Sequence, residues 1–230
     1  MRSTVSRARV EGVVVRLATF GDAHRVVELL SPTHGRLALV ARGARASKKR
    51  FAGVLDAFAS LRCEVELAPT GLSTLVSADL ENLRLGIRRS LEGIERAASL
   101  SQLAQRLAPE HAHADRLHDS LVLGLDALDR GELAPAAGAY MGLLVAAGIA
   151  PDLTSCAACG AKDPTRGALV AELHGLVCPS CARGRTLLSA AALACLATGV
   201  CTDLAAADEA EQAALAWATA LALPSRQRTR

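Results

Sequence analysis

The chain has 230 residues, of which 51% are apolar and 21% charged, a composition typical of a soluble protein with a sizeable core in one large or two modest domains. Its net charge of +3 is unevenly placed, because residues 1–62 carry 12 Lys and Arg against 4 Asp and Glu, whereas residues 81–230 carry 14 against 16. A cationic N-terminal quarter indicates a polyanionic partner such as nucleic acid or, less often, an anionic membrane surface. The N-terminal arginines are followed by no apolar run of secretory length, so we expect no signal peptide.

Residues 10–78 show the alternation of apolar and polar side chains that is typical of half-buried strands. The clearest case is LRCEVEL, in which Leu61, Cys63 and Val65 would face inward while Arg62 and Glu64 face water. The predicted strands are 10–17, 25–30, 36–41, 61–67 and 73–78, separated by turn-forming clusters. Five short strands in so few residues predict a small antiparallel barrel or sandwich.

The block that begins at Ala41, ARGARASKKR, joins the third predicted strand to the fourth. It carries only positive charges, and its polar, Gly-containing sequence predicts an exposed loop. The charged residues are Arg42, Arg45, Lys48, Lys49 and Arg50. The segment FAGVLDAF that follows is expected to form a helical turn.

A charged loop is often only a solvated surface, and this alternative stays open. Two features favour nucleic acid: the charges share one sign, and further arginines lie in the same region. These are Arg2, Arg7, Arg9, Arg16, Arg25 and Arg36. Aromatic residues make up only 2% of the chain, so few side chains could stack on nucleic-acid bases. We therefore predict electrostatic contact with the phosphate backbone and little sequence preference.

From Leu83 onward the apolar residues recur every three or four positions, a pattern that predicts a helix through Leu107. Its apolar face would hold Leu83, Ile87, Leu91, Ile94, Ala98, Leu103 and Leu107. Further helices are predicted over 116–128, 135–147, 190–198 and 208–221. Residues 133–151 carry no charge, but their helical part is too short to cross a bilayer, so we expect a buried core helix there.

Four cysteines interrupt the helical region in the pattern C-x2-C, 18 residues, C-x2-C. They are Cys156, Cys159, Cys178 and Cys181. This spacing lets paired thiolates reach one ion and predicts a structural zinc whose four positions are all filled by sulfur. Disulfides, redox thiols and an iron–sulfur cluster are the alternatives. Seven cysteines without an export signal favour a reducing compartment, and Cys63, Cys195 and Cys201 are expected to be buried thiols.

The sequence shows no motif for catalysis, such as a P-loop, GxSxG or HExxH. Three histidines in PEHAHADRLHDS, His111, His113 and His118, could be taken for a metal site, but an interhelical loop is the favoured interpretation. We therefore expect a binding protein and not an enzyme. A metal-dependent nuclease is the enzymatic rival, and it would need a second set of metal ligands.

The order of a small barrel, a basic loop, a helical body and a four-cysteine insertion resembles the bacterial recombination mediator RecO family. The matching phrases are FGDAHRVVELLSPTHGRLALVARGAR at 20–45, FAGVLDAF at 51–58, and GLLVAAGIAPDLTSCAACG at 142–160, followed by CPSC. The resemblance implies an OB-fold over 1–80 and an all-α domain over 81–230 that carries a zinc ribbon at about 153–184. The fold class that we expect for the whole chain is α+β multidomain.

The resemblance also implies a function in homologous recombination and DNA repair. Such proteins bind single- and double-stranded DNA, anneal complementary strands, and work with RecR to load RecA onto DNA coated with the single-strand-binding protein SSB, whose C-terminal tail docks on the helical domain. They are cytoplasmic and are not enzymes. The family's DNA-contact region falls on Arg36 and Arg42 and continues to Arg50, and the four paired cysteines take the zinc positions. The main alternative is an OB-plus-zinc-ribbon module that acts on RNA or in transcription.

Overall fold

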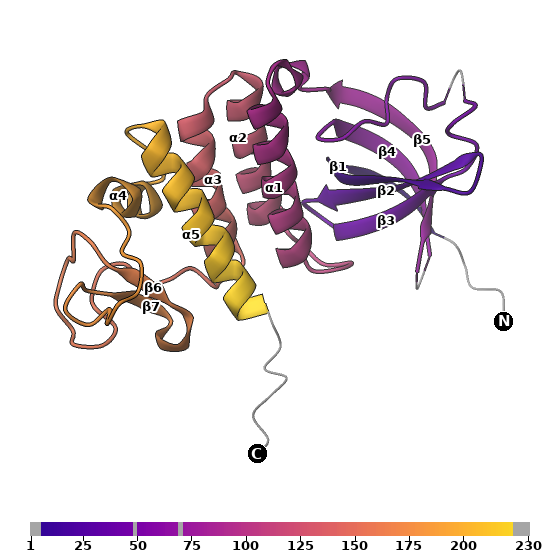
Figure 1. Cartoon of the computed structure of the whole chain (residues 1–230). Coiled ribbons are helices and arrows are strands. Elements are labelled where there is room, and N and C mark those ends of the chain that lie inside the picture. The colour runs from indigo at the N-terminus through magenta and orange to yellow at the C-terminus, as the bar shows by residue number, and fades with distance from the viewer. Residues whose placement is uncertain (1–5, 48–49, 69–70, 223–230) are drawn as a thin grey trace. The chain divides into compact units, whose positions relative to one another are not determined.

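The computed structural model describes residues 6–47, 50–68 and 71–222, and the chain divides into two compact units, 1–131 and 132–230. In the first unit five strands wrap into a closed barrel in the order β1-β2-β3-β5-β4, with β1 also paired to β4 (Figure 1). The strands are β1 (Ser6–Phe20), β2 (His24–Ser31), β3 (Gly35–Ala41), β4 (Ser60–Leu67) and β5 (Ser73–Asn82). Every neighbouring pair is antiparallel except β3 and β5. This is the OB-fold, and all five predicted strands are confirmed.

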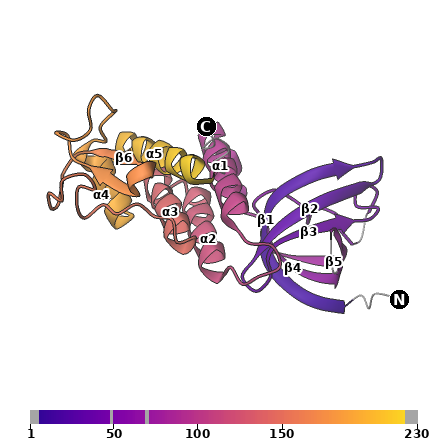
Figure 2. The same cartoon turned by 90° about the horizontal axis from the view of Figure 1, so that it is seen from below.

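Alternating burial along the strands explains the barrel. In β4 the side chains of Leu61, Cys63 and Val65 are buried while Arg62 and Glu64 are exposed. The long β1 pairs with both β2 and β4, and its register shifts between Val14 and Arg16. Such a bulge bends a strand, which lets one strand close both sides of a small barrel. Figure 2 shows the five strands curling around one axis.

Two α-helices and a short 3-10 helix complete the first unit. They are η1 (Leu85–Arg89), α1 (Leu91–Leu107) and α2 (Asp115–Asp129). The backbone N–H of Gly86 in η1 donates to the Asp129 carboxylate at 2.6 Å, and a Cβ at position 86 would lie 1.8 Å from the Asp129 carbonyl oxygen. The glycine is therefore required for η1 to lie this close to the end of α2.

The predicted continuous helix from Leu83 was wrong at its start. Arg84 has left-handed backbone angles, φ 52° and ψ 55°, and Ser90 is extended, with its hydroxyl accepting from the N–H of Gly93. Ser90 thus caps a new helix that begins at Leu91. In its first turn the residues of the predicted apolar face point to solvent, and Leu91 is 71% exposed. Periodicity alone could not place this break.

The second unit contains three helices and a small two-stranded sheet. The helices are α3 (Leu133–Ala146), α4 (Ala190–Thr198) and α5 (Leu204–Ala222). Between α3 and α4 lie β6 (Ala168–Val170), the 3-10 helix η2 (Ala171–Leu173) and β7 (Gly175–Val177), with β6 and β7 antiparallel. The Ser189 hydroxyl caps α4, and the Ser189 N–H donates to Glu209 of α5 at 2.9 Å. The sheet and its loops are thereby tied to α5.

Two further sequence expectations concern this unit. Cys195 and Cys201 form a disulfide, whereas buried thiols were expected. Of the three cysteines outside the C-x2-C pairs, Cys63, in the barrel, is a buried free thiol as predicted. None of the helices in the described part of the chain has the length and apolar character needed to cross a membrane.

Candidate nucleic-acid interface and metal centre

The basic loop between β3 and β4 is exposed, as predicted, but it is also anchored in the barrel. Its apolar side chains, Ala44, Phe51 and Leu55, are buried in the barrel core. Arg42, Arg45 and Arg50, which we call the arginine cluster, are exposed. Lys48 and Lys49 lie outside the described residues. The FAGVLDAF segment forms turns, with the backbone N–H of Val54 donating to the Phe51 carbonyl at 3.3 Å.

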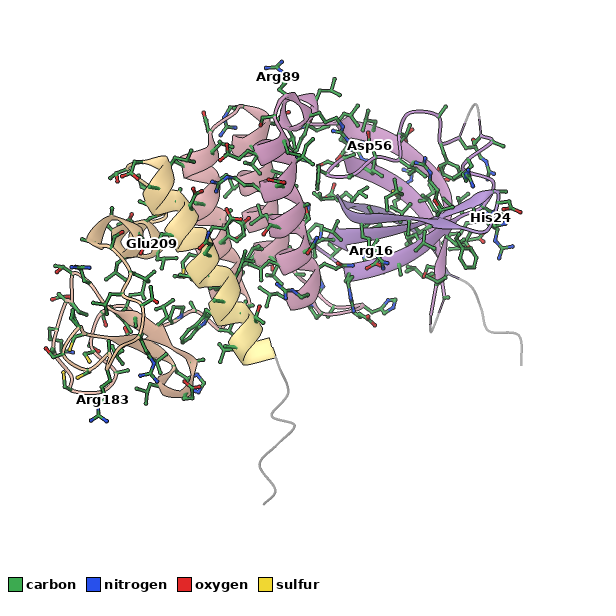
Figure 3. All side chains as sticks on the ribbon, in the orientation of Figure 1. Arg16, His24, Asp56, Arg89, Arg183 and Glu209 are labelled. Atoms are coloured by element: carbon green, nitrogen blue, oxygen red, sulfur yellow. A yellow bond between two sulfur atoms is a disulfide. The ribbon has the colours of Figure 1, made fainter. Side chains whose placement is uncertain are left out.

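Hydrogen bonds attach this loop to the turn between β1 and β2. The Gly43 N–H donates to His24 Nδ1 at 2.9 Å, and the Arg45 N–H donates to the Ala23 carbonyl at 3.2 Å. His24 lies at the end of the barrel remote from α1 (Figure 3). Within the loop, Arg50 Nη2 donates to the Arg42 carbonyl at 3.2 Å. The arginine cluster is therefore held on a fixed part of the barrel.

Most other arginines of the barrel are neutralised by acids on neighbouring strands. Arg7 and Arg9 of β1 lie 3.0 and 3.8 Å from the carboxylates of Glu66 and Glu64, their register partners on β4. The remaining pairs on the barrel flank are Arg16–Glu28 and Arg62–Glu81. Arg7, Arg9 and Arg16 lie in the barrel, as the sequence predicted, but each is paired with a glutamate, unlike the arginine cluster.

Arg36, predicted as a DNA contact, lies away from the loop. It is at the beginning of β3, about 20 Å along the strand from Arg42, and it forms an ion pair with Glu110, in the segment between α1 and α2. The structure brings together Arg42, Arg45 and Arg50 but does not bring Arg36 to them. Of the described carboxylates, none forms an ion pair with the arginine cluster.

This distribution makes one end of the barrel strongly cationic. Arg25 adds a fourth guanidinium there, half-buried, with Nη1 donating to the Leu55 carbonyl at 3.1 Å. Arg50 lies over the Phe51 ring, 5.1 Å from its centroid, which holds the guanidinium in a fixed direction. Uncompensated, preoriented arginines at a surface are suited to bind phosphate groups.

The four predicted metal ligands converge in the second unit. The Sγ atoms of Cys156, Cys159, Cys178 and Cys181 all lie within 4.8 Å of one another. A tetrahedral zinc–thiolate site has sulfurs about 3.8 Å apart, and the Sγ atoms of Cys159 and Cys178 are separated by 3.8 Å. The donor set and its size therefore fit a four-thiolate metal ion.

The two cysteine pairs are presented by similar backbone turns. The N–H of Gly160 donates to the Cys156 carbonyl at 2.8 Å, and the N–H of Ala182 donates to the Cys178 carbonyl at 3.0 Å. The Cys178 N–H donates to Cys156 Sγ at 3.3 Å, and this bond is the main reason that the pKa of the Cys156 thiol is lowered to about 6. A thiolate is therefore already favoured at neutral pH, as metal binding requires.

Sequence reasoning missed Arg84, which is only 2% exposed. Its Nη1 donates to the Phe58 carbonyl at 2.7 Å and to the Ser60 hydroxyl at 2.9 Å, while Nε donates to Asp126 of α2 at 2.7 Å. Arg84 thus links the end of the basic loop to the helices. No local signal marks it, because its partners lie far away in the sequence.

Comparison with known proteins agrees with this architecture. Residues 2–84 match the family model described as Recombination protein O N terminal, and residues 89–223 match that described as Recombination protein O C terminal. The chain is 40% identical to DNA repair protein RecO of Anaeromyxobacter dehalogenans strain 2CP-1, over 84% of this chain and 78% of the relative. It is 35% identical to DNA repair protein RecO of Geobacter sulfurreducens, over 83% and 81% of the two chains. With both halves matched, the chain belongs to the recombination protein O family of DNA repair proteins.

Proposed function

We propose that this protein binds single- and double-stranded DNA through the arginine cluster, by charge and with little sequence preference. One observation carries the proposal: cross-strand acids neutralise the other described arginines on the barrel flank, whereas Arg42, Arg45 and Arg50 share one end of the barrel with no acid partner among the described residues. Phosphate groups would relieve their mutual repulsion. Lys48 and Lys49, adjacent in sequence, add to the same charge.

The proposed role in repair is strand annealing and mediation. Complementary strands repel along their phosphates, so a cationic surface that neutralises both lowers the barrier to pairing, and this requires no catalytic site. Family membership supports cooperation with RecR in loading RecA onto SSB-coated DNA, with the SSB tail as a contact. The test is annealing of SSB-coated strands: we expect SSB that lacks its acidic tail to abolish the stimulation, and undiminished stimulation would refute the SSB contact.

We further propose that the four cysteines hold one structural zinc ion. Four thiolates leave no position for water, so the ion would contribute folding free energy to the ribbon and no reaction. The ribbon has only two three-residue strands and a small core, which supports the need for a metal.

The salt dependence of DNA affinity tests the role of the arginine cluster. Changing Arg42, Arg45 and Arg50 together to Gln should reduce the slope of log K against log salt by about 2 for single strands, since each phosphate contact contributes about 0.7. Affinity at low salt should fall with it. An unchanged slope would refute the assignment of this surface.

The barrel offers a matched control. Arg7, Arg9 and Arg62 are also exposed barrel arginines, but each pairs with a glutamate. Their combined change to Gln removes the same formal charge and should leave the slope within about 0.5 of the wild type. Equal loss in both triple variants would mean that net charge, and not the arginine cluster, determines binding.

A further inference from the structure

The five aromatic residues of the chain differ sharply in exposure. Phe51, Phe58, Tyr140 and Trp217 are each 8% exposed or less. Phe51 belongs to the barrel core, and the Trp217 indole donates to the Ile149 carbonyl at 2.6 Å. Phe20 is 50% exposed. A single exposed apolar side chain is common in proteins, so its surroundings decide whether it has a role.

Phe20 is the last residue of β1 and pairs with His24, the first residue of β2, across the turn formed by residues 21–23. The two rings lie on the same outer face of the sheet, with centroids 6.4 Å apart and planes inclined by 35°. Arg25 pairs with Ala41, the last residue of β3, and the basic loop begins with the next residue, Arg42. The Gly43 N–H donates to His24 Nδ1 and so holds the start of this loop against His24. Phe20 and His24 therefore lie beside the start of the basic loop, which carries Arg42.

These residues supply the two kinds of contact that a nucleotide can make, with its base and with its phosphate. The aromatic ring of Phe20 is half exposed to solvent, and Arg42 carries an exposed positive charge directly after β3. Arg45 lies close by, since its N–H donates to the Ala23 carbonyl in the same turn at 3.2 Å. The turn also carries one acid, Asp22, which is exposed. Cations still outnumber it on this face.

We propose that Phe20, supported by His24, is a stacking platform for an unpaired DNA base whose neighbouring phosphates bind Arg42 and Arg45. The inference rests on the proposed function and deepens it. In a duplex the bases are stacked on one another and their faces are covered, so only single strands can use the platform. The arginine cluster serves both forms of DNA, whereas Phe20 adds affinity for single strands alone.

Leucine at position 20 keeps an apolar side chain but removes the π-face. We expect Phe20→Leu to bind a single-stranded oligonucleotide about tenfold more weakly than the wild type, with duplex affinity unchanged and an unchanged salt slope, since no charge is removed. Phe20→Tyr should restore single-strand affinity. Leu80→Ala, which truncates another exposed apolar residue of the barrel, should affect neither form.

Tryptophan at position 20 provides a direct readout. Single-stranded DNA should quench the fluorescence of Phe20→Trp in a saturable way, beyond any change in the wild type, whose only tryptophan is the buried Trp217. Duplex DNA should not produce this quenching.

The outcomes separate the two proposals. Wild-type protein that binds neither DNA form at low salt refutes the proposed function and this inference with it. If the wild type binds both forms and Phe20→Leu keeps full single-strand affinity, only the platform is refuted. Parallel loss of single-strand and duplex binding in Phe20→Leu would assign Phe20 to barrel stability and also overturn the platform.

Discussion

Arg84 shows how a single buried charge can organise the first unit. It bonds at once to Phe58, at the end of the basic loop, to Ser60 at the start of β4, and to Asp126 of α2. Removing the guanidinium leaves the buried Phe58 carbonyl without this donor and removes one of the links between the loop and the helices. Its left-handed backbone also explains why the chain turns sharply between β5 and α1.

We predict that Arg84→Met lowers the free energy of unfolding by about 2–4 kcal/mol, because the buried Phe58 carbonyl and the Ser60 hydroxyl lose their donor. Urea denaturation, with hydrogen exchange of β4 and β5 amides, would measure the loss. Arg89→Met is the control: Arg89 is exposed and points away from the unit (Figure 3), so its effect should stay within about 0.5 kcal/mol. Equal effects would contradict the role of Arg84.

Cys63 predicts a pH dependence of stability. Burial in the barrel, with repulsion from Asp79 and Glu81, raises the pKa of this thiol from 9.0 to about 12. Because the folded state keeps the proton that the unfolded state loses, the stabilisation is present below pH 9 and is lost as pH rises toward 12.

Comparison with Cys63→Ala isolates this contribution. Between pH 8 and pH 10 the wild type should lose about 1.4 kcal/mol of unfolding free energy more than the variant. Denaturation under reducing conditions at both pH values measures the difference. A gap between the two proteins that does not change with pH would show that Cys63 ionises in the folded barrel.

At the scale of elements, the strands were predictable because inward and outward side chains alternate along them. All five lie within a few residues of the predicted ranges, and so do α2, α3, α4 and α5. The start of α1 was missed because the apolar periodicity runs through it: the break is set by Arg84, whose partners are distant in sequence, and by the local Ser90 cap on Gly93. The four metal ligands were predictable because cysteine spacing directly reflects coordination geometry.

We predict that Cys178→Ala prevents metal binding and unfolds the zinc ribbon. The free energy of unfolding of the second unit should fall, and Trp217 fluorescence reports on α5 in that unit. DNA affinity through the barrel should stay nearly intact. Metal analysis and Trp217 fluorescence test this, with Cys63→Ala as a cysteine variant that should keep the metal. Equal zinc content in Cys178→Ala would contradict the four-thiolate site.

At the scale of the molecule, counting charges by sequence window was misleading. The window 1–62 holds an excess of arginines, but four of the acids that pair with them, Glu64, Glu66, Glu81 and Glu110, come later in the chain. Strand register and the position of the segment between α1 and α2 determine which arginines have an acid partner and which do not. The sequence therefore pointed to the exposed loop of Arg42, Arg45 and Arg50, but it did not reveal the ion pairs of the other arginines, or that Phe20 stays exposed while the other aromatics are buried.

The two compact units predict where the chain can be divided. A fragment of residues 1–131 should unfold cooperatively and show the salt slope of the full chain. A fragment of residues 1–84 lacks Asp126 and should be less stable by at least about 2 kcal/mol, since the buried Arg84 loses its carboxylate partner on α2. Equal stability of the two fragments, measured by thermal and urea unfolding, would show that the barrel does not need these helices.

The paired arginines and glutamates on the flank of the barrel limit how a DNA strand can be held. If DNA binds as we propose, the balanced flank leaves the arginine cluster, among the described residues, to contact the phosphates, and the contact would span few nucleotides. Competing ions would displace so short a contact quickly, and the strand could pass to another protein without leaving a long surface. Nucleotides beyond this contact would be available to pair with their complement.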